Sequence, residues 1–140
     1  MKRVLSLVLA CALFSLVAIP CLAVTSEASA INPRFAYIVV TNVDLEINQS
    51  TNVTTNSLYC CTNDYYEIQA TCKLQRYNNS KWNTVKTWTT SGMEEVSLSK
   101  SWAVPSGYTY RTYVTFYVYD DNGDLLETFA DYDSVYFPAS

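Results

Sequence analysis

Residues 104–120, VPSGYTYRTYVTFYVYD, are the stretch that decides the fold. A Pro-Ser-Gly turn precedes a run of β-branched and aromatic residues, which favour strands over helices. Alternate positions then separate into two rows, as the two-residue period of a strand requires. One row contains Tyr110, Val114, Phe116 and Val118, and the other contains Arg111, Tyr113, Thr115, Tyr117 and Tyr119. We expect the first row to face the core, because the second contains a charge.

The same pattern extends over most of the chain. Turn-forming clusters recur at short intervals without a helical period of apolar residues, which indicates an all-β domain. Seven strands are expected, at residues 36–48, 52–60, 66–77, 82–90, 95–103, 108–119 and 124–137. We expect the first, second and fifth strands to face a sheet of the other four, with a five-stranded barrel as the alternative.

Alternation also predicts the core faces of two other strands. In the first strand the expected core row is Tyr37, Val39, Val43, Leu45 and Ile47. In the third strand it is Ile68, Ala70, Cys72 and Leu74. Polar residues occupy the intervening positions of the third strand, so that sheet should have one wet face.

The segment from Pro105 to Tyr110 resembles the start of the sixth strand in fibronectin type III and other immunoglobulin-like domains. In those domains a turn leads to a tyrosine corner, whose hydroxyl bonds to backbone upstream. Tyr110 occupies the matching position. The resemblance implies a single immunoglobulin-like antiparallel β-sandwich over residues 35–140. The sixth strand has no Cys to pair with the second, so the antibody hallmark is absent.

A second resemblance covers most of the chain after its N-terminal segment. The residues that carry it are Leu74, Gln75, Asn78, Trp82, Val85 and Trp88, then Ser97 to Ser101, then Gly107 to Arg111. This pattern is similar to a family of small secreted proteins of unknown function from clostridial-type Gram-positive bacteria. The resemblance implies secretion and a β-rich domain, and it implies no activity or site residues. The cysteines after residue 23 and the Asp-rich last turn depart from that pattern.

The N-terminus has the layout of a signal peptide. Lys2 and Arg3 precede an apolar run, Val4 to Ile19, and small residues lead to a cleavage site after Ala23. Cleavage after Ala30 and lipid attachment at Cys11 are the alternatives. We therefore expect a signal peptide at residues 1–23, a flexible leader at 24–34, and a secreted protein, extracellular or at the cell surface, without a membrane span.

Charge and composition exclude several function classes. The chain has a net charge of −4 and no basic cluster, which argues against nucleic-acid partners. It contains no His, so His-based catalytic triads and His metal ligands are excluded. The acids Glu94, Glu95, Asp131 and Asp133 offer no spacing that defines a hydrolytic pair. We expect no enzyme activity and no cofactor.

Three cysteines follow residue 23. The strand assignment places Cys60 and Cys61 at the end of one strand and Cys72 well inside the next, beyond the reach of a disulfide. We expect three free thiols, with Cys72 buried; the alternative is an intermolecular bridge through an exposed Cys60 or Cys61. A zinc site is disfavoured, because it would require four well-placed ligands.

The Asp-rich segment near the last turn has two interpretations. Asp120 to Asp124 could suggest calcium, but Asn-Gly between two alternating strands is the signal of a two-residue hairpin turn, which we favour.

The chain also has more Tyr and Trp than a small core needs. The expected binding face consists of Arg111, Tyr113, Tyr117 and Tyr119 with Lys73, Gln75 and Tyr77. It predicts a non-catalytic binding module for a glycan or a cell-surface protein; a secreted antagonist or toxin-like protein is the alternative.

Overall fold

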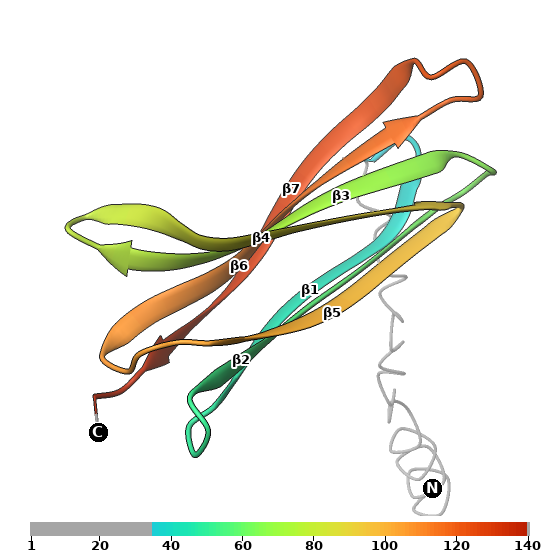
Figure 1. The fold of residues 1–140 in the computed structure, drawn as a ribbon. Coiled ribbons are helices and arrows are strands. Elements are labelled where there is room, and N and C mark those ends of the chain that lie inside the picture. Colours follow the sequence, from blue (N-terminus) through green and yellow to red (C-terminus); the bar gives the residue numbers. More distant parts are fainter. Residues whose placement is uncertain (1–34, 140) are drawn as a thin grey trace, which may run out of the picture. The chain divides into compact units, whose positions relative to one another are not determined.

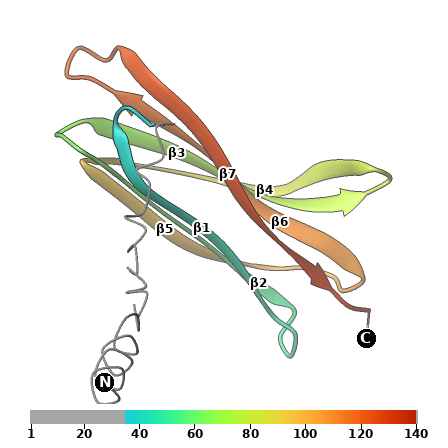
Figure 2. The ribbon, with the colours of Figure 1, turned by 180° about the vertical axis from the view of Figure 1, so that it is seen from behind.

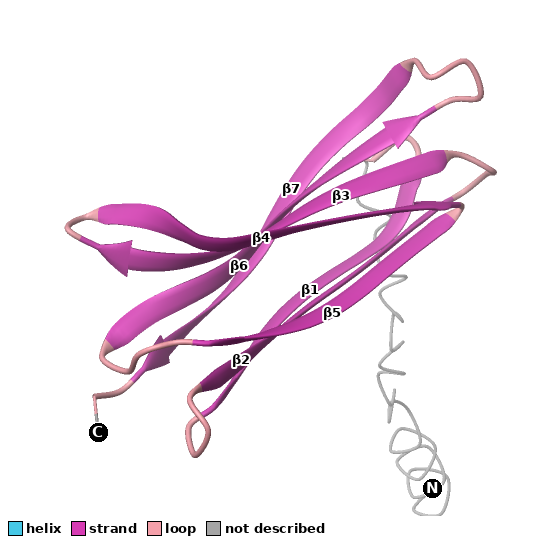
Figure 3. Ribbon diagram, viewed as in Figure 1, coloured by secondary structure: helices cyan, strands magenta, loops and turns pink. Residues whose placement is uncertain are grey.

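The computed structural model describes residues 35–139, which form seven strands and no helix (Figures 1 and 3). The strands are β1 (Ile38–Asn48), β2 (Val53–Thr62), β3 (Glu67–Asn78), β4 (Lys81–Met93), β5 (Glu95–Ala103), β6 (Tyr108–Tyr119) and β7 (Leu125–Phe137). The expected signal peptide and leader, residues 1–34, lie outside the described residues. No helix among residues 35–139 is long and apolar enough to cross a membrane.

The strands form two antiparallel sheets that pack as layers. One has the order β1-β2-β5 and the other the order β4-β3-β6-β7. This division confirms the prediction from the sequence, and the expected bounds agree within a few residues. The two sheets are visible as separate layers in Figures 1 and 2, where the β3–β4 hairpin extends beyond the three-stranded sheet.

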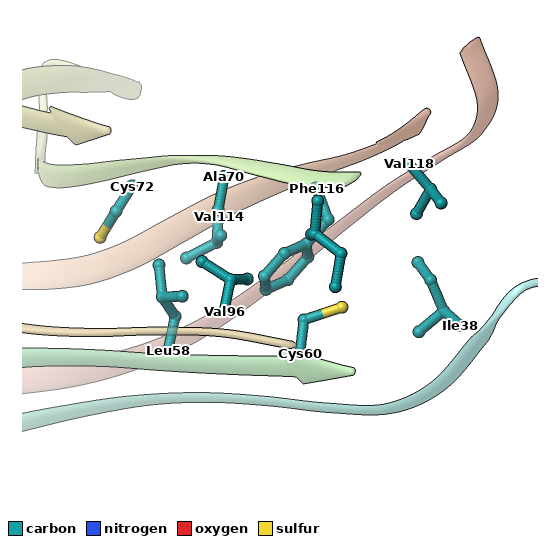
Figure 4. Packing of buried hydrophobic residues seen from close by; sticks show 10 residues of the cluster. Ile38, Leu58, Cys60, Ala70, Cys72, Val96, Val114, Phe116 and Val118 are labelled. Carbon is teal, nitrogen blue, oxygen red and sulfur yellow. The ribbon is translucent and has the colours of Figure 1, made fainter. Parts of the chain in front are cut away.

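The core lies between the sheets and comes from the alternate positions of the inner strands. Figure 4 shows Cys72, Val114 and Phe116 of the larger sheet pointing toward Leu58 and Cys60 of the smaller one. The expected core rows of β3 and β6 are confirmed, since the side chains of both rows are buried. Burial of this apolar surface is the main force that holds the two layers together.

One expected core residue of β1 is placed differently. The pairing of β1 with β2 shifts between Ile38 and Val40, which is the mark of a bulge. Ile38 is therefore buried, and Val39 is 59% exposed. The prediction that Val39 faces the core is wrong, because a bulge reverses the alternation on one side of it.

The core is divided by a buried polar network. On β6, Thr112 lies between Tyr110 of one apolar cluster and Val114 of the other. The Thr112 hydroxyl donates a hydrogen bond of 2.8 Å to Asn56 Oδ1 on β2. Asn56 Nδ2 in turn donates to Thr54 Oγ1 at 3.0 Å and to the Lys100 carbonyl at 3.1 Å. The network joins the two sheets, and Thr54, Asn56 and Thr112 are all inaccessible to solvent.

The gap between the edge strands β1 and β7 is closed by carboxylates of β7. The Glu127 carboxylate accepts hydrogen bonds from the backbone N–H groups of Ala36, Tyr37 and Ile38, at 3.3, 3.0 and 3.2 Å. Farther along, Asp133 Oδ2 accepts one from the Leu45 N–H at 2.9 Å. β1 and β7 lie side by side in Figure 2. These side chains satisfy backbone donors that an edge strand leaves unpaired.

Tyr110 has the geometry expected of a tyrosine corner. Its side chain is fully buried, and its hydroxyl donates a 2.7 Å hydrogen bond to the Pro105 carbonyl. Gly107, at φ 87°, makes the intervening turn, and its N–H donates to the Phe137 carbonyl at 2.8 Å. Burial raises the pKa of Tyr110, while the positive charge of Arg76 opposes that rise.

Replacing Tyr110 with Phe is expected to lower the free energy of unfolding by about 1–2 kcal/mol. The ring stays in place, and only the bond to Pro105 is lost. Pro105 is exposed, so water can reach its carbonyl and keep the loss moderate. Chemical denaturation measures the change, with the half-buried Tyr108 replaced by Phe as the control. A loss near zero would mean that the hydroxyl does not hold the turn.

Candidate binding face

The structure places all seven residues of the expected binding face on the outer face of the larger sheet. β3 and β6 are neighbours whose register pairs Gln75 with Arg111 and Lys73 with Tyr113. The same register puts Tyr117 and Tyr119 farther along β6, and Tyr77 at the end of β3. Their neighbours in sequence are the buried core rows of both strands. The seven side chains therefore share one face, and whether that face binds a ligand stays a prediction.

Arg111 is the centre of an aromatic cluster on this face. Its guanidinium carbon lies 4.3 Å from the Trp82 ring centroid, 4.9 Å from that of Tyr113 and 5.5 Å from that of Tyr132. Its Nε donates a 2.8 Å hydrogen bond to Gln75 Oε1. Cation–π contacts of this kind fix both the charge and the rings. The contacts within the protein thus preorganise the cluster without a ligand.

Two members of this cluster were missed by reasoning from the sequence. Trp82 comes from β4, where its ring lies 5.1 Å from that of Tyr77, and Tyr132 comes from β7. Tyr132 and Tyr136 are 57% and 61% exposed. The sequence predicted a strand at residues 124–137, but it did not predict which strand lies beside it. Those positions could be placed only once β7 was known to pair with β6.

At the other end of the face the surface is hollowed. A depression of about 350 Å³ lies over β3 and β4, with two tyrosines of β6 along it. Its lining residues are Gln69, Ala70, Thr71, Thr89, Thr90, Ser91, Tyr117 and Tyr119. Of the residues predicted from the sequence, only the last two belong to it. The predicted face is therefore divided into an Arg111 cluster and a hollow.

The outer face of the smaller sheet has a different character. Its β2 and β5 positions are mostly hydroxyl residues, for example Ser57 and Ser99, whose hydroxyl oxygens lie 3.3 Å apart. One aromatic residue of β2, Tyr59, is half-buried there, within 3.4 Å of Glu95 Oε2. The aromatic residues of the two outer faces thus lie mainly on the larger sheet. Its outer face is therefore the better candidate for a binding site.

The three cysteines after residue 34 are all free thiols. Cys72 is buried as predicted, and Cys60 is also fully buried, so of the two cysteines considered for an intermolecular bridge only Cys61 reaches the surface. Cys60 points into the core because it continues the inward row of β2, whereas Cys61 faces outward and is half-buried. Burial raises the pKa of Cys60 to about 12, with Cys61 and Glu127 adding to the rise. Burial also raises the pKa of Cys72 to about 11.

These pKa values predict a difference in thiol reactivity. At pH 8, Cys60 and Cys72 should be thiolate in about one molecule in a thousand or fewer, and the thiolate is the form that reacts. Iodoacetamide should therefore label Cys61 in the native protein and all three thiols after unfolding. Peptide mapping by mass spectrometry identifies the labelled residue. Equal labelling of Cys60 and Cys61 in the native state would contradict the placement of the β2 inward row.

The Asp-rich segment is a turn, but a longer one than the predicted two-residue hairpin. β6 ends at Tyr119 and β7 begins at Leu125, so residues 120–124 form the loop. Asp120 Oδ1 accepts hydrogen bonds from the N–H groups of Asn122 and Asp124, both at 2.9 Å. The Asp124 N–H bond is the main cause that lowers the pKa of Asp120. Within residues 35–139, no group of three or more Cys, Asp or Glu side chains is placed to hold a metal ion.

The four acids considered for hydrolysis do not come together. Glu94 and Glu95 lie at the corner between β4 and β5, whereas Asp131 and Asp133 lie on β7. β4 and β7 are the opposite edges of the larger sheet, separated by β3 and β6. Asp133 is already engaged with the β1 backbone. The fold thus offers no carboxylate pair across these two strands.

A scan against protein-family models found no match to the chain, and a search of curated proteins found none either. The resemblance to small secreted proteins of clostridial-type bacteria therefore stays a prediction.

Proposed function

We propose that the protein is a secreted, non-catalytic binding module with an immunoglobulin-like sandwich, and that the outer face of the larger sheet is its binding site. The observation that carries the proposal is the concentration of aromatic side chains on this face, three around the Arg111 guanidinium and two along the hollow: Trp82, Tyr113, Tyr132, Tyr117 and Tyr119. Aromatic and Arg side chains are enriched where proteins bind partners, because they combine large apolar area with polar tips. A glycan or a cell-surface protein would be the ligand.

The structure supplies the support for the immunoglobulin-like part of the proposal. The grouping of β1, β2 and β5 against the other four strands is compatible with such a sandwich. The Tyr110 hydroxyl, bonded to backbone five residues upstream, is the second supporting feature. Secretion rests on the sequence of residues 1–23 alone.

The decisive test replaces both Tyr113 and Tyr117 with Ser. The purified protein would be applied to a printed array of neutral, acidic and sulfated glycans and to a panel of displayed extracellular proteins. The double variant should lose at least about tenfold in affinity for whatever the wild type binds, because ring area contributes most of such contacts. It should stay folded, since both rings are only half-buried.

Tyr59→Ser is the matched control, because it removes one tyrosine from the outer face of the other sheet. Binding of this control should equal that of the wild type. If the Tyr113/Tyr117 variant unfolds, the rings serve stability and the proposal loses its support. If it folds and binds as the wild type does, the site lies elsewhere.

A further inference from the structure

The hollow on the binding face arises from a row of short side chains. The strand registers align Thr89, Thr71, Thr115 and Ala130 across all four strands of the larger sheet. On one side of this row stand Lys73 and Tyr113, and on the other stand Gln69 and Tyr117. Thr89 and Thr71, the members of this row on β4 and β3, line the hollow, and Gln69 and Tyr117 line its other side. Its volume, about 350 Å³, lies near the lower end of the range of small-ligand sites, which is about 300–1,000 Å³.

The chemistry of this hollow is polar and uncharged. None of its lining residues carries a charge, and the lining includes Thr and Ser residues, one amide and two phenols. The nearest charges along β3 are Glu67 and Lys73, one of each sign, which flank the hollow at its two ends. Gln69 Nε2 is held by Glu67 Oε1 at 2.9 Å, so the amide is oriented. Such a site gives no preference to an anion or a cation, while the chain as a whole, at −4, disfavours polyanions.

Tyr117 and Tyr119 add apolar area to these donors and acceptors. Residues two apart on a strand stand on the same face about 7 Å from each other. A sugar ring has an apolar face of C–H groups and an edge of hydroxyls. The first fits a phenol ring, and the second fits threonine, serine and glutamine side chains.

The Arg111 end of the face is less suited to this ligand. The Arg111 guanidinium is in contact with three rings, and its Nε is bonded to Gln75. A new ligand there would have to displace contacts that already exist. Trp82 and Tyr77, which belong to the overhanging β3–β4 hairpin, are also engaged with each other.

From these observations, and resting on the proposed function, we propose that the hollow over β3 and β4 binds a neutral glycan, with Tyr117 and Tyr119 as its stacking wall. The Arg111 cluster then supports the neighbouring surface and does not contact the sugar.

Isothermal titration with neutral hexasaccharides tests the proposal, using hexamers of cellulose, xylan, starch and chitin as probes and polygalacturonate as the charged comparison. At least one neutral hexamer should bind, and polygalacturonate should not. Thr89→Trp should weaken binding at least about tenfold by filling the hollow, because Thr89 is exposed and its replacement removes no core contact. Ser134→Trp is the control, since it adds the same ring to the same face on β7, beside Arg111. It should change the affinity less than about twofold.

Failure of this inference is separable from failure of the proposed function. Binding of none of the neutral hexamers would overturn the ligand class, while the glycan array and protein panel still decide whether the face binds. If Thr89→Trp binds normally and the Tyr113/Tyr117 double variant does not, the hollow is wrong and the face stands. If both bind normally, both proposals fail. Loss of binding in the Ser134→Trp control would move the site to the Arg111 cluster.

Discussion

Replacing Asn56 with Ala is expected to lower the free energy of unfolding by about 3–4 kcal/mol. The change leaves the Thr112 hydroxyl, which is inaccessible to solvent, without its acceptor, and it also removes the bonds to Thr54 Oγ1 and to the Lys100 carbonyl. Each unsatisfied buried group costs about 1–3 kcal/mol, and the cavity left by the amide adds to the loss. Denaturant titration monitored by tryptophan fluorescence would measure it.

Two further variants distinguish the effect of losing the hydrogen-bond network from the effect of losing side-chain volume. Ser57→Ala, one residue along β2, removes a hydroxyl from the outer face and should cost almost nothing. The double variant Asn56→Leu/Thr112→Val replaces both partners of the inter-sheet bond by apolar groups, so it should be more stable than Asn56→Ala. If the double variant is the less stable of the two, the polar network itself stabilises the domain.

Much of the fold was predictable from the sequence because its determinants are local. Alternation along β3 and β6 defines their core faces, and turn residues such as Gly107 separate the strands. Tyr110 could be assigned from its distance to the Pro105 turn. These signals depend on residues close together in the chain, and the structure has them where they were expected.

The Asn56 network was not predictable in the same way. Asn56 and Thr54 occupy the inward row of β2, where a polar residue ordinarily indicates a solvent-facing position. Their burial depends on Thr112, which is distant in the chain and supplies the bond from the other sheet. A single polar residue in an apolar row does not reveal whether a partner exists across the core.

The candidate binding face was predicted in its centre and missed at its edges, at β4 because of a bulge and at β7 because its pairing with β6 was not known. The pairing of β3 with β4 skips Val85. Trp82 and Thr84, at even-numbered positions, therefore point to the same face as Thr87, at an odd-numbered position. A similar shift between Val118 and Tyr119 interrupts the pairing of β6 with β7. Sequence alternation alone cannot predict which side chains share a face on the two sides of such a shift. The hollow is lined by residues of three strands, β3, β4 and β6, and was therefore not predictable either.

Replacing Glu127 with Ala is expected to lower the free energy of unfolding by about 2–3 kcal/mol and to release the start of β1. One carboxylate accepts three backbone N–H groups, from Ala36, Tyr37 and Ile38, and hydrogen bonds to a charged group are the stronger ones. Ile38 belongs to the main core cluster, so its loosening would also weaken apolar packing. The exposure of Ala36 limits the loss, because water can replace the carboxylate there.

Asp131→Ala is the matched control for this prediction. Asp131 lies on the same strand as Glu127, but its Oδ1 accepts a hydrogen bond from the adjacent Tyr132 N–H and not from β1. It should leave stability nearly unchanged. Hydrogen exchange should show faster exchange of the Tyr37 and Ile38 amides in Glu127→Ala, while the Leu45 amide, held by Asp133, keeps its protection. A loss of stability without that local change would mean that Glu127 acts through the core and not by holding the β1 edge.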